Sequence, residues 1–309
     1  MIVTVTPNPS IDRTLRIPSI ARGSVNRAAA ATAEAAGKGI NVARALSIHG
    51  HAALAVVPLS VSSAAAFTEM LGDTVRFEAV TIGHDVRVNV SLVEQDGTVT
   101  KINEPGPQLE PDDVDAIIAR TEAFAKGADW VVACGSLPPG APTDLYARLA
   151  SHLGSGPRLA VDAEGEALRA SIGARVALIK PNHDELEGLV GHPLLTLGDV
   201  VSAAAALVEQ GVHAVLVSLG PDGAVLVDRD GASHAEAKIG DMVNSVGAGD
   251  ALLAGYLAAG GGHAALGPAV AWSVAACRTP GTQMRAVQPE DLAAVTVNPG
   301  PRANRRLAA

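Results

Sequence analysis

From about residue 110 to the end of the chain, short apolar runs alternate with longer segments of helical periodicity. Helices are predicted over 111–126 and 200–210. The apolar runs predict buried strands at 130–134, 159–162, 176–180, 214–219 and 224–228, the last of them pairing with a strand near 235–239. Strands that alternate with helices indicate a mainly parallel sheet with helices on both faces. Such sheets bind ligands at the carboxyl ends of their strands.

The first third of the chain follows a different pattern. Residues 1–6 predict a short strand, and 10–18 alternate polar and apolar residues as an exposed strand does. Residues 85–103 alternate again, with a hairpin turn at 95–97. This two-stranded ribbon suits a flap that covers a ligand, and an ordinary edge hairpin would have the same periodicity. For 52–73 we expect a strand and a helix without firm boundaries.

Composition narrows the class of protein. The 309 residues permit one large α/β domain or two ordinary ones, and with 48% hydrophobic but 2% aromatic residues the core must consist of Ala, Val, Leu and Ile. A net charge of -9 argues against a nucleic-acid surface. The low-charge run 251–277 is broken by glycines and a proline, which predicts two buried helices rather than a membrane span. Without an apparent signal peptide, and with two cysteines expected as buried thiols, we expect a cytoplasmic protein.

A glycine-rich turn at 244–250 runs directly into an Ala/Leu-rich helix. Free backbone N–H groups and the helix dipole make such a turn an anion site, and glycines let a phosphate approach closely. Asp250 is predicted at the N-cap, beside the anion, where a carboxylate would repel phosphate unless it takes a proton from a neighbour. This combination suggests phosphoryl transfer with Asp250 as the base. The alternative is a helix cap and a turn without chemistry.

A second glycine turn, with Lys38 between Gly37 and Gly39, also opens a helix. The spacing is not that of a Walker A loop, but it suggests an anion pocket; a solvated lysine is the alternative. Further turns follow predicted strands at 135–136, 180–185 and 218–223. All should converge on one edge of the sheet.

Six motifs, in this order, resemble the ribokinase-like, PfkB-type carbohydrate kinases, most closely their 1-phosphofructokinase and tagatose-6-phosphate kinase branch. They are Thr6-Pro-Asn-Pro9 with Asp12, Ala36-Gly-Lys-Gly-Ile-Asn-Val-Ala-Arg44, Gly135-Ser-Leu-Pro-Pro-Gly140, Lys180-Pro-Asn182 with Glu185, Ser218-Leu-Gly220, and Val246-Gly-Ala-Gly-Asp250. The resemblance implies a ribokinase-like three-layer α/β fold over 1–309 as a single domain. It also implies a small β-sheet lid, formed by about 10–30 and 85–104, that pairs between the subunits of a homodimer.

The resemblance implies ATP-dependent phosphorylation of a sugar or sugar phosphate. Asp250 matches the catalytic base, and the preceding turn matches the anion hole: Gly247, Ala248 and Gly249. Asn182 and Glu185 match a motif that positions Mg²⁺ through water, and an i,i+3 surface pair is the weaker alternative for Glu185. The remaining positions matched to the nucleotide are Lys180, Ser218, Gly220 and Gly223. A monovalent cation near Arg278–Gly281, as in some relatives, stays open.

On the acceptor side, Asp12, Gly39 and Asn41 match residues that bond sugar hydroxyls. Lys38, Arg87 and Ser136 suit the phosphate of an already phosphorylated sugar. We therefore expect fructose 1-phosphate, phosphorylated at C6. Open alternatives are a ketose 6-phosphate phosphorylated at C1, an unphosphorylated sugar or nucleoside, and a sugar-phosphate sensor without catalysis. Three stretches depart from the family pattern: 58–63, which puts the acceptor in doubt, Cys134, and 162–165.

Overall fold

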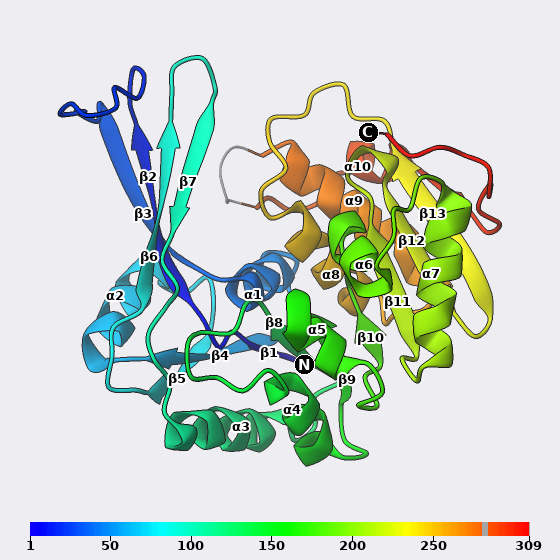
Figure 1. Cartoon of the computed structure of the whole chain (residues 1–309), viewed down its shortest axis with the longest axis horizontal. Helices are drawn as coiled ribbons and strands as arrows, with labels where there is room; N and C mark the ends of the chain where they lie inside the picture. Colours follow the sequence, from blue (N-terminus) through cyan, green and yellow to red (C-terminus); the bar gives the residue numbers. More distant parts are fainter. Residues whose placement is uncertain (280–283, 309) are drawn as a thin grey trace.

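The computed structural model describes residues 1–279 and 284–308. A large sheet of ten strands forms its centre (Figure 1). In spatial order the strands are β14 (Val295–Asn298), β13 (Gly231–Ala237), β12 (Ala224–Asp228), β11 (Ala214–Ser218), β10 (Leu178–Ile179), β9 (Arg158–Asp162), β8 (Trp130–Cys134), β1 (Ile2–Val5), β4 (Ala53–Leu59) and β5 (Phe77–Thr81). The seven strands from β11 to β5 are parallel, and β12, β13 and β14 add an antiparallel edge. The predicted mainly parallel sheet is confirmed.

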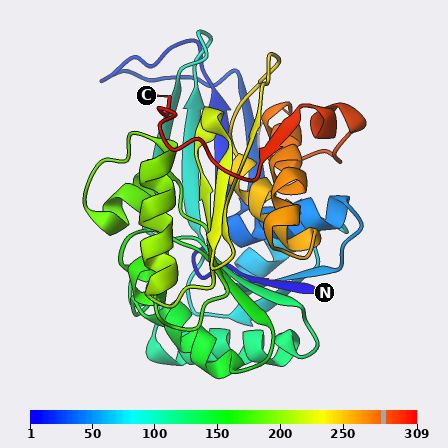
Figure 2. The ribbon, with the colours of Figure 1, turned by 90° about the vertical axis from the view of Figure 1, so that its right-hand side faces the viewer.

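Helices cover both faces of this sheet because its strands are apolar on both sides. In β1, Val3 and Val5 pack into one core while Ile2 packs into the other. The first core includes α3 (Pro111–Ala125), α4 (Leu145–Leu153), α5 (Gly165–Ser171) and α7 (Leu197–Glu209); the second includes α1 (Lys38–Ile48), α8 (Ala248–Ala258) and α9 (Leu266–Cys277). Figure 2 shows the layers from the side, with α7 in yellow-green and α8 and α9 in orange on opposite faces. The predicted three-layer arrangement is confirmed.

Two predicted strands differ in their boundaries. The run predicted at 176–180 contributes only the two residues of β10 to the sheet. The partner of β12 was expected near 235–239, but β13 begins at Gly231, which pairs with Asp228 across a tight turn. A glycine with a φ of +133° opens β13, so the chain reverses sooner than the apolar pattern suggested.

A second sheet of four strands projects from the body beside α1 (Figure 1). Its order is β3 (Ala30–Ala36), β2 (Ser10–Arg16), β6 (Arg87–Val93) and β7 (Val99–Asn103). The predicted ribbon and its turn correspond to β6 and β7. These strands are antiparallel, with Asn89 opposite Asn103 at one end and Val93 opposite Val99 beside the turn. β3 lies almost entirely beyond the predicted 10–30 segment. It was not predicted because its Ala-rich sequence carries no alternating pattern.

The serine-rich stretch after β4 forms the start of α2 (Val61–Leu71). Ser60 is the N-cap, and its hydroxyl accepts the N–H of Ser63. The hydroxyls of Ser60, Ser62 and Ser63 all donate to the Asp85 carboxylate, just before β6. The departure from the family pattern at 58–63 therefore ties α2 to the beginning of a strand in the small sheet.

The low-charge run near the C-terminus forms two helices, as predicted. α8 and α9 are mostly buried and pack against each other. Two further helices are short: α6 (His183–Val190) and α10 (Pro289–Ala293). Among the described residues, none of the helices has both the length and the apolar character needed to cross a membrane.

Candidate active site

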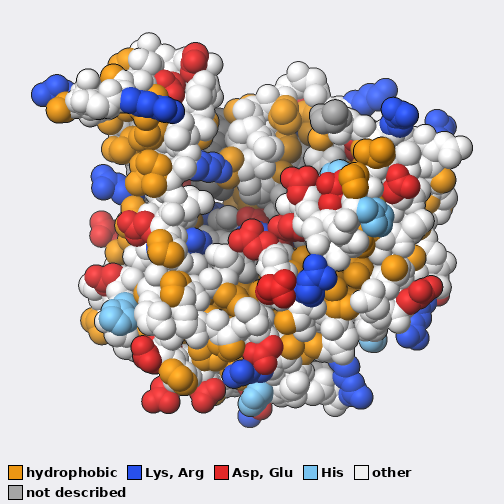
Figure 3. Space-filling view, in the orientation of Figure 1, with side chains coloured by type: hydrophobic (Ala, Val, Ile, Leu, Met, Phe, Trp, Pro, Cys, Tyr) orange, Lys and Arg blue, Asp and Glu red, His pale blue; other side chains and the backbone are white. Residues whose placement is uncertain are grey.

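Charged side chains from distant parts of the sequence meet where the parallel strands end. The Lys38 ammonium at the start of α1 lies 2.9 Å from the Asp162 carboxylate at the end of β9. The Asn41 amide donates to the Asp250 carboxylate of α8 over 2.8 Å. Figure 3 shows the hollow between the four-stranded sheet and the body, with both acidic and basic side chains along it. The expected convergence of the glycine turns on one edge is thus observed for these turns.

Asp250 lies in the first turn of α8, but it is not the N-cap. Gly247 takes that position in the left-handed conformation, with a φ of +77°, so the helix begins at Ala248 and Asp250 is its third residue. The prediction of an N-cap at Asp250 was wrong, because the glycine completes the turn earlier. The carboxyl is buried at 8% exposure. Burial first, and the nearby charge of Asp162 second, raise its pKa to about 6.

The turn before Asp250 presents backbone donors. Ala248 donates its N–H to the carbonyl oxygen of Ser245 over 3.2 Å. The N–H groups of Gly249 and Asp250 belong to the first helical turn, where amides lack acceptors within the helix. A Cβ added to Gly249 would lie 3.5 Å from the Lys180 ammonium, so this lysine sits directly beside the turn. The turn and Lys180 together can hold an anion.

Asp162 is the centre of the charge cluster. It is fully buried, with Lys38 2.9 Å from one carboxylate oxygen and Lys180 3.1 Å from the other. Burial opposes its ionisation, but Lys180 and Lys38 outweigh burial and hold the pKa of Asp162 below its usual range. In turn, Asp162 raises the pKa of Lys38, although burial alone would lower it. Asp162 was predicted only as part of the departure from the family pattern at 162–165. The available signal in the sequence was a carboxylate at the end of a buried strand.

Asn182 and Glu185 open α6 (His183–Val190) as a capping box. The Asn182 side chain accepts the Glu185 N–H over 2.8 Å, and the Glu185 carboxylate accepts the Asn182 N–H over 2.8 Å. The second Glu185 oxygen lies 3.9 Å from the Lys38 ammonium. Burial raises the pKa of this carboxyl. The pair therefore has a structural role and also faces the charge cluster.

The predicted nucleotide loop lies next to this capping box. Ser218 forms a parallel bridge with Asn182 as β11 ends, and Leu219 donates its N–H to the Gly223 carbonyl oxygen. Gly223 has a φ of +84°, and a Cβ there would lie 2.0 Å from a backbone carbonyl oxygen of β13. Gly220, with a φ of +55°, has open space around it. The loop is thus a tight glycine turn at the strand ends.

A second polar group lies on the side of the four-stranded sheet. Asp12 of β2 accepts hydrogen bonds from Ser10, over 2.7 Å, and from Asn89 of β6, over 2.9 Å. Arg87 donates to the backbone carbonyl oxygens of Glu104 and Asn8. Ser136, in the loop after β8, accepts from the Asn8 side chain over 3.3 Å. These residues come from both sheets and surround the same strand ends.

Several buried polar atoms in this second group have no hydrogen-bond partner among the described residues. They are Arg87 Nε, Asn8 Oδ1, Asn89 Oδ1 and, deeper, Thr6 Oγ1. Leaving such atoms unpaired costs about 1–3 kcal/mol each, so they are suited to a polar ligand. A Cβ on Gly39 would lie 2.4 Å from the Thr6 hydroxyl oxygen, so Gly39 keeps α1 close to β1. Asn8 lies within the first of the six motifs but was given no role of its own, and Asn89 was predicted only as part of the alternating stretch 85–103.

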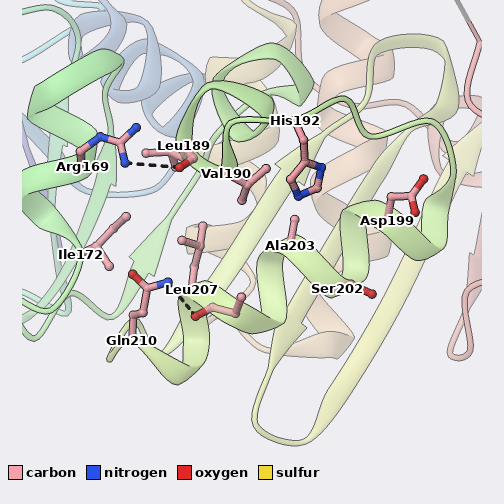
Figure 4. Close-up of a pocket in the computed structure, with 11 residues that line it drawn as sticks. Arg169, Ile172, Leu189, Val190, His192, Asp199, Ser202, Ala203, Leu207 and Gln210 are labelled. Atoms are coloured by element: carbon pink, nitrogen blue, oxygen red, sulfur yellow. Dashed lines mark hydrogen bonds between the residues drawn. The ribbon is translucent and has the colours of Figure 1, made fainter.

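Two other places do not belong to this cluster. A hollow of about 600 Å³ lies between α5, α6 and α7 (Figure 4), where Arg169 donates to the carbonyl oxygens of Gly188 and Leu189. It contains none of the predicted site residues. The expected monovalent-cation segment lies partly outside the described residues, which resume at 284; within it, Arg278 pairs with Asp241 and Asp291.

Comparison with known proteins agrees with this arrangement. The profile of the pfkB family carbohydrate kinases matches residues 6–284. A 1-phosphofructokinase from Rhodobacter capsulatus is 40% identical over 83% of this chain and 82% of its own length, and one from Bacillus subtilis is 36% identical over 84% and 85%. Phosphofructokinase-2 from Escherichia coli, solved in complex with potassium, is 30% identical with a TM-score of 0.87 over 94% of this chain and 96% of its own. Its tetrameric inhibited form is 32% identical, with a TM-score of 0.84 over 89% and 93%. The chain belongs to the pfkB family of carbohydrate kinases.

Proposed function

We propose that this kinase transfers the γ-phosphoryl group of ATP to the C6 hydroxyl of fructose 1-phosphate, forming fructose 1,6-bisphosphate and ADP. The observation that carries the proposal is the buried Asp250 beside a glycine turn, whose Gly249 and Asp250 amides lack acceptors within the helix, and beside two lysines. The curated relatives named 1-phosphofructokinase support this acceptor.

In the proposed reaction, the acceptor hydroxyl gives its proton to the Asp250 carboxylate while its oxygen bonds to the γ-phosphorus. The bond from that phosphorus to the bridging oxygen breaks, and ADP leaves. With a pKa raised to about 6, Asp250 is mostly ionised at neutral pH yet basic enough to take the proton. Lys180 and the turn of Gly247, Ala248 and Gly249, in which the Gly249 N–H has no acceptor within the helix, offset the charge on the equatorial oxygens.

The residues at the start of α6 fit a hydrated magnesium ion. In the capping box, the side-chain oxygen of Asn182 and one carboxylate oxygen of Glu185 each accept one backbone N–H. Each side chain keeps acceptor capacity that suits the waters of a hydrated ion, because Mg²⁺ gives up its waters reluctantly. Bound there, Mg²⁺ would neutralise charge on the ATP phosphates. We assign the nucleotide to Lys180 and the loop of Ser218, Gly220 and Gly223. We also propose a monovalent cation, by analogy with the potassium complex of the Escherichia coli enzyme.

For the acceptor, we assign Asp12, Gly39 and Asn41 to the sugar hydroxyls. The unpaired atoms beside Asp12 and Arg87 support a polar ligand at this position. We assign the phosphate of the acceptor to Lys38, Arg87 and Ser136. A guanidinium and an ammonium form charge-assisted bonds to a phosphate, and a neutral sugar would leave these cations without that partner.

We further propose that the four-stranded sheet is a lid over the sugar and that two subunits associate through it. Val25 is 78% exposed, Ile102 57% and Val99 51%, so this sheet and its loop offer apolar side chains that a partner subunit can cover. The tetrameric form of the Escherichia coli neighbour supports self-association in the family. Because the reaction needs ATP and a phosphosugar, we infer that it takes place in the cytoplasm.

The deciding experiment measures ADP release from Mg-ATP with fructose 1-phosphate, fructose 6-phosphate, tagatose 6-phosphate, free fructose, ribose and adenosine. Asp250→Asn is the blank. We expect strong turnover of fructose 1-phosphate, abolished in the variant. Preference for a ketose 6-phosphate would move the assignment to phosphorylation at C1. Ligand binding without any turnover would support a sensor instead.

A further inference from the structure

Arg44 links the catalytic carboxylate to the small sheet, although it belongs to neither. It lies one helical turn after Asn41 on α1 and is half-buried. One guanidinium nitrogen donates to the Asn41 side-chain oxygen over 3.2 Å, and another donates to the Ala35 carbonyl oxygen of β3 over 3.0 Å. The Asn41 amide nitrogen in turn donates to Asp250 over 2.8 Å. These contacts form a continuous chain from β3 to α8.

The chemistry of the groups fixes the direction of this chain. A guanidinium only donates hydrogen bonds, so the atom of Asn41 that faces Arg44 must be its carbonyl oxygen. The amide nitrogen then necessarily faces Asp250. Without Arg44, the amide could turn over and place its oxygen against the carboxylate, where it would repel the ionised form.

We propose that Arg44 is a positioning residue for phosphoryl transfer: it holds the Asn41 amide so that its N–H donates to the ionised form of Asp250. The catalytic part of this inference rests on the proposed function, whereas the orientation of the amide does not. The anchor on Ala35 also makes the orientation depend on the placement of β3, a strand of the proposed lid.

Other groups around Asp250 also influence its ionisation and must stay constant in the test. Asp162 raises its pKa, and Lys180 and Lys38 lower it; the buried Cys134 thiol shares the same surroundings. Among the described residues, the side chain of Arg44 donates to Asn41 and Ala35, and its electrostatic neighbour is Glu34. A substitution at Arg44 therefore reaches Asp250 through Asn41 or through long-range charge.

The test replaces Arg44 by Met, which keeps the apolar stem and removes the donors. The carboxyl of Asp250 is titrated by ¹³C NMR in protein labelled at aspartate carboxyls, and the resonance is assigned by its loss in Asp250→Asn. We expect the pKa to rise by about 0.5 to 1 unit, or about 0.7 to 1.4 kcal/mol, which is about half of one hydrogen bond to a charged group, because the amide loses its fixed orientation but is still present. The acid limb of kcat should move equally, so that kcat at pH 6 falls about threefold. Arg44→Lys, which keeps a donor, should restore most of the loss.

A double-mutant cycle separates orientation from charge. In an Asn41→Ala background, Arg44→Met should leave the Asp250 titration unchanged, because the residue through which it acts is absent. Equal shifts in both backgrounds, or no shift in either, would overturn the inference. Arg169→Met, which also removes an arginine bonded to backbone carbonyls, is the control and should not move the titration.

The NMR titration needs no substrate, so it decides the inference even if the wild-type protein phosphorylates none of the sugars. That result would refute the proposed function alone. If Arg44→Met fails to fold, Arg44→Lys and the Asn41→Ala variant are compared instead. A wild-type titration of Asp250 in Asn41→Ala would then contradict the proposal.

Discussion

The replacement Asp162→Asn tests whether one buried carboxylate organises the site. It keeps the shape of the side chain and removes a charge that is shared by two lysines. The Lys180 side chain is 5% exposed and loses its neighbouring anion; breaking a buried pair in this way costs about 3–5 kcal/mol. The Lys38 side chain is 35% exposed, so water replaces much of its lost partner. The loss of its ion pair therefore lowers the free energy of unfolding by about 1 kcal/mol or less. We expect a total loss of about 3 kcal/mol or more.

Urea unfolding and thermal melting measure this loss. For 309 residues, about 3 kcal/mol corresponds to a decrease in Tm of about 5 °C. Because the pKa of Asp162 is depressed in the folded protein, its stabilisation is present above its unfolded pKa of about 4. The difference from wild type should therefore be full at neutral pH and shrink as the pH falls through the lower folded value.

The matched control is Asp129→Asn, which removes a carboxylate 2.7 Å from the N-terminal amine but 68% exposed. It should cost far less than Asp162→Asn, because water replaces the lost partner of an exposed ion pair. The kcat for phosphoryl transfer should fall in Asp162→Asn alone, because both lysines lose the anchor that sets their positions. Equal Tm values and equal kcat values for the two variants would refute this reasoning.

Further predictions concern other parts of the molecule. The kcat should be level above about pH 6 and fall about tenfold per pH unit below it, since Asp250 must be ionised to accept a proton; an acid limb near pH 4 in the pH–rate profile would contradict the raised pKa. Lys38→Ala should raise the KM for the phosphosugar about tenfold or more and leave that for ATP nearly unchanged, and equal effects in steady-state kinetics would contradict its assignment. Gly223→Ala should lower the free energy of unfolding by about 2 kcal/mol or more through a clash with backbone, whereas Gly220→Ala, in open space, should cost about 1 kcal/mol in the same urea titration. Ile102→Glu should shift the protein to monomers in light scattering, and an unchanged mass would argue against association through the lid.

The fold was predictable where the sequence repeats a pattern. Buried apolar runs such as 130–134 and 214–218 lie in the sheet as expected, because strands covered on both faces need near-continuous apolar residues. The glycine turns before α1 and α8 were also predictable, because glycine allows the backbone to enter a helix at positive φ. Parallel strands then bring the turns to one edge. β3 was not predictable in this way, because an alanine-rich strand has no periodic signal.

The contacts inside the site were beyond the reach of sequence patterns. Lys38 and Asp162 are 124 residues apart, and Asn41 and Asp250 are 209 apart, so no local spacing predicts that they meet. Asn41 was assigned to the sugar from the resemblance, and its bond to Asp250 emerged only from the packing of α1 against α8. The orientation of its amide depends on Arg44, a further tertiary contact.

These contacts give Asp162 two opposing effects on the proposed reaction. In a protein with a net charge of -9, it concentrates two cations where anionic substrates would bind, because it holds the ammonium groups of Lys38 and Lys180 beside the turn at Gly249. The same charge raises the pKa of Asp250 and so reduces the ionised fraction at mildly acidic pH. Asp162→Asn should therefore lower the plateau of kcat and at the same time move its acid limb to lower pH. A residue that only stabilised the fold would not move the acid limb along the pH axis. A lower plateau of kcat together with an acid limb at lower pH therefore distinguishes an electrostatic role from a structural one.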